Sequence, residues 1–277
     1  MKNFYIACLC LFVAAGAFAQ KKEKIKGSKV VTVTQKESQP FDALEVEDNI
    51  EVFLVKGATQ AIEIEADDNL HESITTEMYG TTLRLATSKQ VTGYKKLSVR
   101  ITYTDNLKTI TGKHESVINA LADLDMPAVT VKNVDYSKSF LNVKAPNFTL
   151  SLNDKAKAEI NVKSDTTSID ISKNAELKAL IASTEVKIDL YQKTTAAVEG
   201  DAANAKIRVD NNATFTGKRF TVKNMELVAE SYSTASVMAT ENIAISATGK
   251  AEVQLLGKPK VTIPNFADSA VIYKKEQ

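Results

Sequence analysis

Residues 155–190 of the chain read KAKAEINVKSDTTSIDISKNAELKALIASTEVKIDL and contain the same short motif twice. The motif is a polar residue, an alanine, any residue and an apolar residue, first at Lys155–Ala158 and again at Asn174–Leu177. Between the two copies apolar and polar residues alternate, as at Ile169 and Ile171, which is typical of a strand with one buried face. This stretch therefore combines a repeat with a strand pattern.

The motif recurs through the second half of the chain at spacings of 16 to 22 residues, about 19 on average. Its alanines are Ala156, Ala175, Ala196, Ala213, Ala235 and Ala251, and Thr111–Val117 is a degenerate earlier member. Short alternating runs lie between the motifs, and one such coil cannot bury its apolar face without stacking on its neighbours. The pattern predicts an all-β fold, a right-handed parallel β-helix or β-solenoid of stacked coils about 20 residues long.

A β-sandwich is the competing fold, since it also has short alternating strands and frequent turns. Sandwich hairpins usually rely on glycine and proline at tight turns, whereas the chain has only 10 Gly and 5 Pro. The alanine motif also stays in phase with the strands, which unrelated hairpins do not require. For residues 105–260, both observations favour the solenoid and argue against the β-sandwich.

The first half of the chain shows the same alternation from Phe41 onward, so we expect N-terminal strands packed on the same solenoid. The best helical candidate is short, residues 68–78. We expect a solenoid domain at residues 41–260 and a C-terminal cap or tail at 261–277. Residues 20–40 are basic and polar and are expected to be a flexible leader, with an edge strand near residues 30–33.

The first nineteen residues predict a secretory signal peptide. Lys2 supplies the positive charge, residues 4–13 are an apolar run too short to span a bilayer, and Ala17–Ala19 is a small-x-small cleavage site before Gln20. We therefore expect export to the periplasm, the outer cell surface or the medium. After cleavage we expect no transmembrane segment.

The composition argues against nucleic-acid binding and against cysteine chemistry. The 35 basic and 34 acidic side chains give a net charge of +1, which argues against a nucleic-acid partner. Both cysteines, Cys8 and Cys10, lie inside the expected signal peptide. The exported chain is thus predicted to have no disulfide, thiolate nucleophile or cysteine metal site.

The order of loose motifs in the first half resembles a known family, the putative auto-transporter adhesin, head GIN domain proteins of Bacteroidetes. The motifs that carry the resemblance are FDALEV (41–46), IEVFLVKG (50–57), IEIEADDNL (62–70), GTTLRL (80–85), SVRITY (98–103) and LKTI (107–110). The resemblance covers residues 41–260 and implies stacked β-coils, export and no established enzyme activity. This chain departs from the family in having Ala, Lys and Thr where glycine-rich coil corners are usual.

Candidate catalytic groups are few. His71 and His114 are the only histidines, and the chain has no H-E-x-x-H, G-x-S-x-G, P-loop or G-x-G-x-x-G motif. We therefore expect no catalytic residue and no cofactor. Glycan-active enzymes on parallel β-helices place acidic and basic residues on neighbouring coils, but Arg208 and Arg219 are not one period apart.

Two sets of residues are candidate binding sites. The densest acidic patch, Asp67, Asp68 and Asn69, offers the oxygen ligands that calcium prefers. Tyr136, Tyr191 and Tyr232 lie at turn-like positions, where an exposed ring can stack on a sugar or can instead cover the core.

The sequence thus favours a non-catalytic, exported interaction module, adhesin-like, whose partner is a protein or glycan at the cell envelope. Two alternatives stay open. One is a β-helix lyase or hydrolase that acts on glycans, and the other is a purely structural periplasmic protein.

Overall fold

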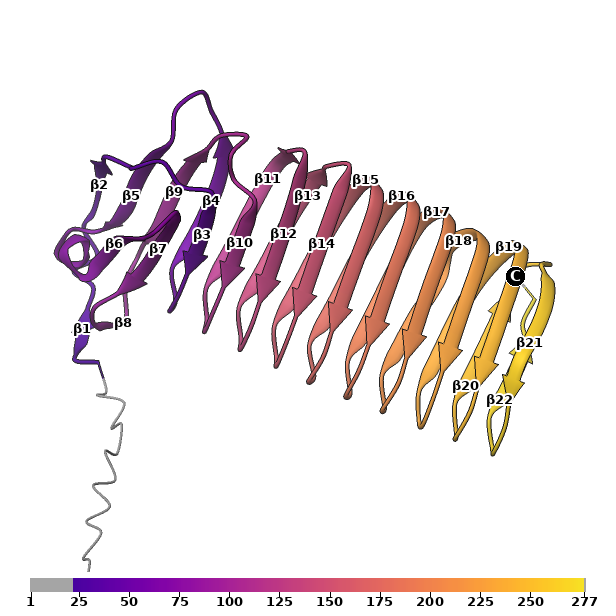
Figure 1. Cartoon of the computed structure of the whole chain (residues 1–277). Coiled ribbons are helices and arrows are strands. Elements are labelled where there is room, and N and C mark those ends of the chain that lie inside the picture. Colours follow the sequence, from indigo (N-terminus) through magenta and orange to yellow (C-terminus); the bar gives the residue numbers. More distant parts are fainter. Residues whose placement is uncertain (1–21, 277) are drawn as a thin grey trace, which may run out of the picture.

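The repeat forms a stack of parallel coils (Figure 1). The structure is a computed structural model that describes residues 22–276, so the expected signal peptide at residues 1–19 lies outside the described residues. About 67% of the chain is strand and 2% is helix, and the solenoid has about 9 turns, ~19 residues apart. The β-solenoid prediction is confirmed, and the β-sandwich alternative is wrong.

Five long strands show how a coil is built. Each ascends one face of the solenoid, bends over the corner drawn at the top of Figure 1 and descends on the other face. They are β15 (Lys157–Ile171), β16 (Glu176–Leu190), β17 (Thr195–Val209), β18 (Thr214–Ala229) and β19 (Thr234–Ala247). Neighbours pair in parallel, for example Ile169 with Ile188 and Ile188 with Ile207. Identical apolar positions therefore stack along the axis and fill the space between the two faces.

Shorter strands extend both faces. The face with the ascending halves also contains β9 (Leu97–Tyr103), β4 (Glu51–Lys56), β11 (Val117–Asp125), β13 (Lys138–Lys144), β20 (Glu252–Leu256) and β22 (Val271–Lys274). The descending face also contains β7 (Thr82–Thr87), β3 (Ala43–Val46), β10 (Thr109–Gly112), β12 (Ala128–Asn133), β14 (Asn147–Leu152) and β21 (Lys260–Phe266). The strands expected in the first half are thus packed on the same solenoid.

A tight turn closes each coil at the edge drawn at the bottom of Figure 1, and we call these turns the row of turns. The second residue of each turn has a positive φ. These residues are Asp48, His114, Asp135, Asp154, Lys173, Gln192, Asn211, Ser231, Gly249 and Asp268. Half of them are Asp or Asn, which tolerate the left-handed region through local hydrogen bonds. This tolerance explains why the coils close with so little glycine.

The fourth turn residue is buried and stacks in one row along the solenoid, which we call the buried turn row. Its members are Ile50, Ser116, Ser137, Ala156, Ala175, Thr194, Ala213, Ser233, Ala251 and Ala270. Two of the alanines that define the sequence motif, Ala196 and Ala235, lie two positions further on and stack on Phe215. The motif therefore mixes two rows, which accounts for its uneven spacing.

The N-terminal end is closed by antiparallel strands. β5 (Ala61–Asp67) pairs with β9, β6 (Ile74–Tyr79) pairs with β7, and β2 (Val31–Lys36) pairs with β5. The remaining elements here are β1 (Lys24–Lys26), which pairs with β8 (Gln90–Thr92), and the 3₁₀ helix η1 (Asp68–Ser73). We call residues 22–103 the head.

Two local expectations differ from the structure of the head. The flexible leader expected at residues 20–40 contains two paired strands, of which β2 lies where an edge strand was expected and β1 was not expected. The edges of β5 and β8 supply their hydrogen-bond partners. The helix expected at residues 68–78 is one short 3₁₀ segment followed by strand β6, because Ile74 and the residues after it pair with β7.

The segment expected as a C-terminal cap or tail, residues 261–277, contains most of β21 and all of β22. These strands pair with β19 and β20 and so form a further coil. In the part of the chain that the structure describes, no helix is long and apolar enough to cross a bilayer.

Candidate functional site

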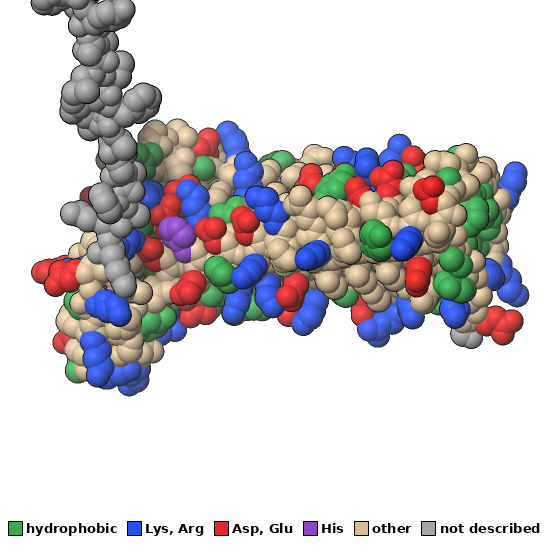
Figure 2. Space-filling model, turned by 90° about the horizontal axis from the view of Figure 1, so that it is seen from below, with side chains coloured by type: hydrophobic (Ala, Val, Ile, Leu, Met, Phe, Trp, Pro, Cys, Tyr) green, Lys and Arg blue, Asp and Glu red, His purple; other side chains and the backbone are tan. Residues whose placement is uncertain are grey.

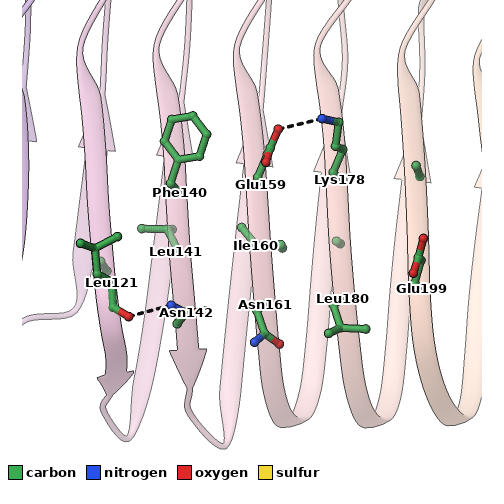
Figure 3. A pocket seen from close by; sticks show the side chains of 13 residues that line it. Leu121, Phe140, Leu141, Asn142, Glu159, Ile160, Asn161, Lys178, Leu180 and Glu199 are labelled. Atoms are coloured by element: carbon green, nitrogen blue, oxygen red, sulfur yellow. Dashed lines mark hydrogen bonds and ion pairs between the residues drawn. The ribbon is translucent and has the colours of Figure 1, made fainter.

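A furrow crosses the face made by the ascending strands, between two outward-facing rows of side chains (Figure 3). Strand pairing sets both rows. In one row Phe140 pairs with Glu159 and Glu159 with Lys178. In the other Asn161 pairs with Leu180 and Leu180 with Glu199. The residues between the rows point inward and form the floor of the furrow: Ala120, Leu141, Ile160 and Ala179. The hollow has a volume of about 440 Å³.

A bulge in β11 shapes the end of the furrow nearer the head. Ala120 pairs with Leu141 and Leu124 pairs with Val143, so residues 121–123 lie opposite Asn142 alone. The extra residues turn outward, and Leu121 is 74% exposed. The Asn142 amide donates to the Leu121 carbonyl oxygen at 2.8 Å, which holds the bulge in place. Bulges of this kind re-aim a side chain without breaking a sheet.

Three large apolar side chains stand out from the furrow walls. Besides Leu121, Phe140 is 38% exposed and Leu180 is 49% exposed, although both belong to regular strands whose neighbours on this face are mostly polar. Leu121 and Leu180 are separated by three coil steps, or roughly 14 Å at the usual spacing of strands. The sheet thus holds three separate apolar side chains along the furrow, with Phe140 on one wall and Leu121 and Leu180 on the other (Figure 3), and we call these three side chains the apolar track.

Ion pairs border this track. Lys178 Nζ lies 2.8 Å from Glu159 Oε1, and this hydrogen bond raises the pKa of the Lys178 ammonium above its ordinary value. Glu199 pairs with Arg219 on the next coil. Each pair joins neighbouring coils, so both walls of the furrow contain opposite charges side by side and have no net attraction for one sign of ligand.

The three candidate tyrosines lie on the row of turns, away from the furrow. Tyr136 and Tyr232 occupy the third turn position and Tyr191 the first, so all three belong to one edge of the solenoid. Tyr136 and Tyr232 are five coils apart, or roughly 24 Å. The structure therefore does not bring them together into one site.

A cation from a neighbouring coil covers each of these rings. Lys155 lies 5.0 Å from the ring centroid of Tyr136, Arg208 5.6 Å from that of Tyr191, and Lys250 5.2 Å from that of Tyr232. Lys155 Nζ also donates to the Tyr136 hydroxyl at 3.1 Å. Cation–π contacts of this kind hold adjacent turns together. Figure 2 views the molecule from this edge, where acidic and basic side chains are mixed along the solenoid.

The candidate calcium ligands Asp67, Asp68 and Asn69 are engaged by the head itself. The Asp67 carboxylate is buried and accepts backbone N–H groups of Lys29, Lys95 and Lys96 at 2.8 to 3.1 Å. Burial by itself would raise the pKa of Asp67, but these hydrogen bonds outweigh it and lower the pKa below its ordinary value.

The neighbouring side chains fasten the same segment. Asp68 accepts the Ser28 hydroxyl, while Asn69 accepts the Ser28 backbone N–H at 2.9 Å and donates to the Lys26 carbonyl at 2.9 Å. Within residues 22–276, no group of three or more His, Cys, Asp or Glu side chains is arranged to hold a metal ion. The arrangement seen here joins β1 and β2 to the rest of the head.

The two histidines lie on separate parts of the surface. His71 Nε2 is 2.9 Å from the Thr32 hydroxyl in the head. His114 Nδ1 lies 3.6 Å from the Asp48 carboxylate, which also binds Lys22 at 2.6 Å and the Thr87 backbone N–H at 2.8 Å. Lys22 and Thr87 belong to the head, whereas His114 belongs to the first coil after it, so Asp48 links the head to that coil.

Sequence reasoning missed the furrow residues Leu121, Phe140 and Leu180. A signal was present for two of them, because Phe140 and Leu180 fall at positions where the alternation predicts a polar, outward-facing residue. Leu121 had no such signal, since a three-residue bulge cannot be inferred from one strand alone.

Comparison with known proteins assigns the chain to a family. The family model described as "Putative auto-transporter adhesin, head GIN domain" matches residues 40–259. Among curated proteins, no sequence matches the chain significantly.

Three solved structures share the fold. A putative adhesin from Parabacteroides distasonis ATCC 8503 has a TM-score of 0.66 at 16% identity and covers 92% of this chain and 98% of its own. A putative lipid binding protein from the same organism has a TM-score of 0.64 at 12% identity, covering 91% of this chain and 100% of its own. A putative adhesin from Parabacteroides merdae ATCC 43184 has a TM-score of 0.58 at 16% identity, covering 92% and 98%.

Proposed function

Because the chain belongs to the putative auto-transporter adhesin, head GIN domain family, we propose that it is a non-catalytic, exported interaction module that binds a protein or glycan partner of the cell envelope. The adhesin-like character of the family supports binding to an external partner. The sequence supports export through the signal peptide predicted at residues 1–19.

The observation that carries this proposal is the apolar track of Leu121, Phe140 and Leu180. Three large exposed apolar side chains that border one furrow offer a partner apolar area to cover, which supports an interaction surface here. Each is fixed by strand pairing or by the bulge, so a partner meets a preformed surface and little conformational entropy is lost on binding.

The chemistry of the furrow suits an extended partner. The aromatic face of Phe140 offers stacking to a sugar ring or an apolar side chain, and the Asn142 and Asn161 amides beside it offer hydrogen bonds. The walls run along the solenoid axis, so a bound chain would lie across several coils.

A binding screen tests the proposal. The exported protein, purified after secretion, is immobilised and probed with glycan arrays and with envelope and host-surface proteins. We expect at least one ligand whose binding falls more than about tenfold in the variant Leu121→Ser/Phe140→Ser/Leu180→Ser. Unchanged binding by this variant contradicts the proposed site.

Two matched controls separate the furrow from other surfaces. Val55→Ser changes an exposed apolar residue on the same face outside the furrow, and we expect it to leave binding unchanged. Tyr136→Ala/Tyr232→Ala removes two of the candidate rings on the row of turns. Loss of binding in this variant alone would move the site to that edge.

Location is tested separately. Protease treatment of intact cells, followed by a blot for the mature chain, is expected to degrade the protein without lysis. Protection until the outer membrane is permeabilised would indicate a periplasmic partner instead of a host or surface partner.

A further inference from the structure

The last coil leaves the apolar core of the solenoid uncovered. Val261 and Phe266 of β21 pair with the buried Ile243 and Ala247 of β19 and so lie over the core, and Ile263 lies between them, beside the bulge of β21. Val261, Ile263 and Phe266 are nevertheless 44%, 50% and 54% exposed, because no further coil lies on them in the part of the chain that is described. Terminal coils of solenoids usually carry a polar outer face.

The opposite end differs at the equivalent positions. Outermost strand β2 places Thr32 and Thr34 over the buried Ala66 and Ile64 of β5. Leu70 of η1 is fully buried and helps to close the core. Among residues 22–276, the C-terminal end therefore differs from the N-terminal end in having an apolar surface continuous with the stacking interface between coils.

The open end also has unpaired backbone. β21 pairs only with β19 and β22 only with β20 among residues 22–276. A lipid surface would cover the side chains but leave these N–H and C=O groups without partners in hydrocarbon, which is costly. Pro264 lacks an N–H and sits at a bulge in β21, whereas the four residues of β22 contain no proline. Another protein edge is thus the better match, through β22 and the apolar side chains of β21.

Charge selects the partner and its orientation. Lys260 begins β21 and Lys274 ends β22, so both lie at one end of the strands, while Asp268 lies in the turn at the other end. When two copies meet with β21 against β21 and β22 against β22, the strands run antiparallel and the lysines of each copy approach Asp268 of the other. The alternative two-fold arrangement, β21 against β22, would bring the lysines together.

We propose that the open C-terminal coil is the interface of a two-fold dimer, in which a second copy of this chain covers Val261, Ile263 and Phe266. The head closes the other end, so the arrangement ends at two copies and does not propagate into a fibre. A dimer of this kind holds the two furrows on one rigid body, which raises the avidity for a repeated ligand. The inference does not depend on the proposed function, since it concerns a different surface.

Sedimentation equilibrium of the exported protein tests this dimer across micromolar concentrations. We expect a monomer–dimer equilibrium whose dissociation constant rises on the order of 100-fold in Ile263→Lys, because each interface acquires two buried charges. Lys274→Glu is expected to raise it on the order of tenfold. The controls are Val33→Lys, an exposed valine that is 59% accessible on the terminal strand of the closed end, and Lys24→Glu. Both are expected to leave the equilibrium unchanged.

Three outcomes overturn the proposal. The first is a wild-type protein that stays monomeric at every concentration, and the second is a dimer that Ile263→Lys weakens no more than Val33→Lys does. The third is a monomer that floats with anionic phospholipid vesicles and loses that binding in Ile263→Lys, which would make the open end a membrane contact. Circular-dichroism melts establish that Ile263→Lys is folded, as expected for a side chain already half exposed.

Discussion

The two ends of the solenoid differ in how the apolar core is covered. At the N-terminal end the chain turns back on itself, pairs β2, β5 and β6 antiparallel and places threonines over the core. At the C-terminal end the parallel coils stop with an apolar layer uncovered. Stacking of identical coils has no natural limit, so closure must be encoded separately, and among residues 22–276 it is seen at the N-terminal end.

The ends also differ in electrostatics. The carboxyl groups with a lowered pKa are Asp42, Glu47, Asp48 and Asp67, and all lie in the head. The coils are joined instead by exposed ion pairs one period apart, such as Lys157 with Glu176, which contribute little individually. The head is therefore held partly by charge, whereas the coils depend on apolar packing.

The largest effect is expected from breaking the solenoid between its ends at Gly200. This residue has a φ of +104°, and an added Cβ would lie 2.1 Å from the Ile181 carbonyl oxygen of the preceding coil. We expect Gly200→Ala to lower the free energy of unfolding by at least about 3 kcal/mol. Hydrogen exchange should show faster opening of β16 to β18, while the head keeps its protection.

Gly80 is the matched control for Gly200. Its φ is also positive, at +63°, but an added Cβ meets nothing within 4 Å. Gly80→Ala should therefore cost only about 1–2 kcal/mol, the price of the left-handed conformation. Equal destabilisation by the two substitutions would contradict the claim that close approach of coils, and not φ alone, requires Gly200.

A second pair of substitutions measures how open the C-terminal end is. Ile188 and Ile263 face the same core, the first in the middle of the stack and buried, the second in the last coil. At concentrations where the protein is monomeric, we expect Ile188→Ala to cost about 2–5 kcal/mol and Ile263→Ala less than about 1 kcal/mol. Denaturant unfolding measures both. A comparable cost at Ile263 would mean that this end is already covered in the monomer.

We expect low pH to destabilise the head before it destabilises the C-terminal coils. The folded-state pKa of Asp67 is lowered, so its carboxylate stabilises the head above the unfolded-state pKa of about 3.9, and that contribution is lost as the pH falls through the folded-state value. We expect hydrogen exchange of β1 and β2 to accelerate below about pH 4 relative to β19 and β20.

Asp67→Asn isolates this carboxylate. The amide retains one acceptor oxygen but does not titrate, so the backbone N–H groups of Lys29, Lys95 and Lys96 should exchange about tenfold faster at neutral pH. The acid dependence of β1 should then weaken. An unchanged acid response in Asp67→Asn would assign the effect to the other head carboxylates.

Much of this fold follows from the sequence, because period-two alternation and a repeat of about 19 residues leave few architectures. The register of the coils could not be predicted from the alanine motif. Thr194 and Ser233 occupy the buried turn row, whereas the motif alanines Ala196 and Ala235 lie two residues later. Strand β1 did not follow from the sequence either, because it forms only by pairing with β8, about 66 positions further along the chain. Leu121 shows the same limit for the site, because its exposure depends on a bulge relative to the neighbouring coil.

The smallest expected effect compares two serines in the buried turn row, one beside the head and one near the open end. The Ser137 hydroxyl donates to the Val134 carbonyl at 2.8 Å and accepts from the Asn133 amide at 3.2 Å. The Ser233 hydroxyl is buried and has no hydrogen-bond partner. Ser137→Ala should therefore destabilise the protein by about 1 kcal/mol, whereas Ser233→Ala should stabilise it by up to about 1 kcal/mol.

The opposite signs are the informative part of this comparison, because the two positions share one row and receive the same substitution. Alanine already occupies that row at Ala156, Ala175 and Ala213, so neither change disturbs the packing pattern. Thermal melts of both variants, at equal concentration and pH, measure the two shifts. A loss of stability in both would show that Ser233 has a partner when the protein is in solution. A gain in both would mean that the hydrogen bonds of the Ser137 hydroxyl to Asn133 and Val134 do not stabilise the fold.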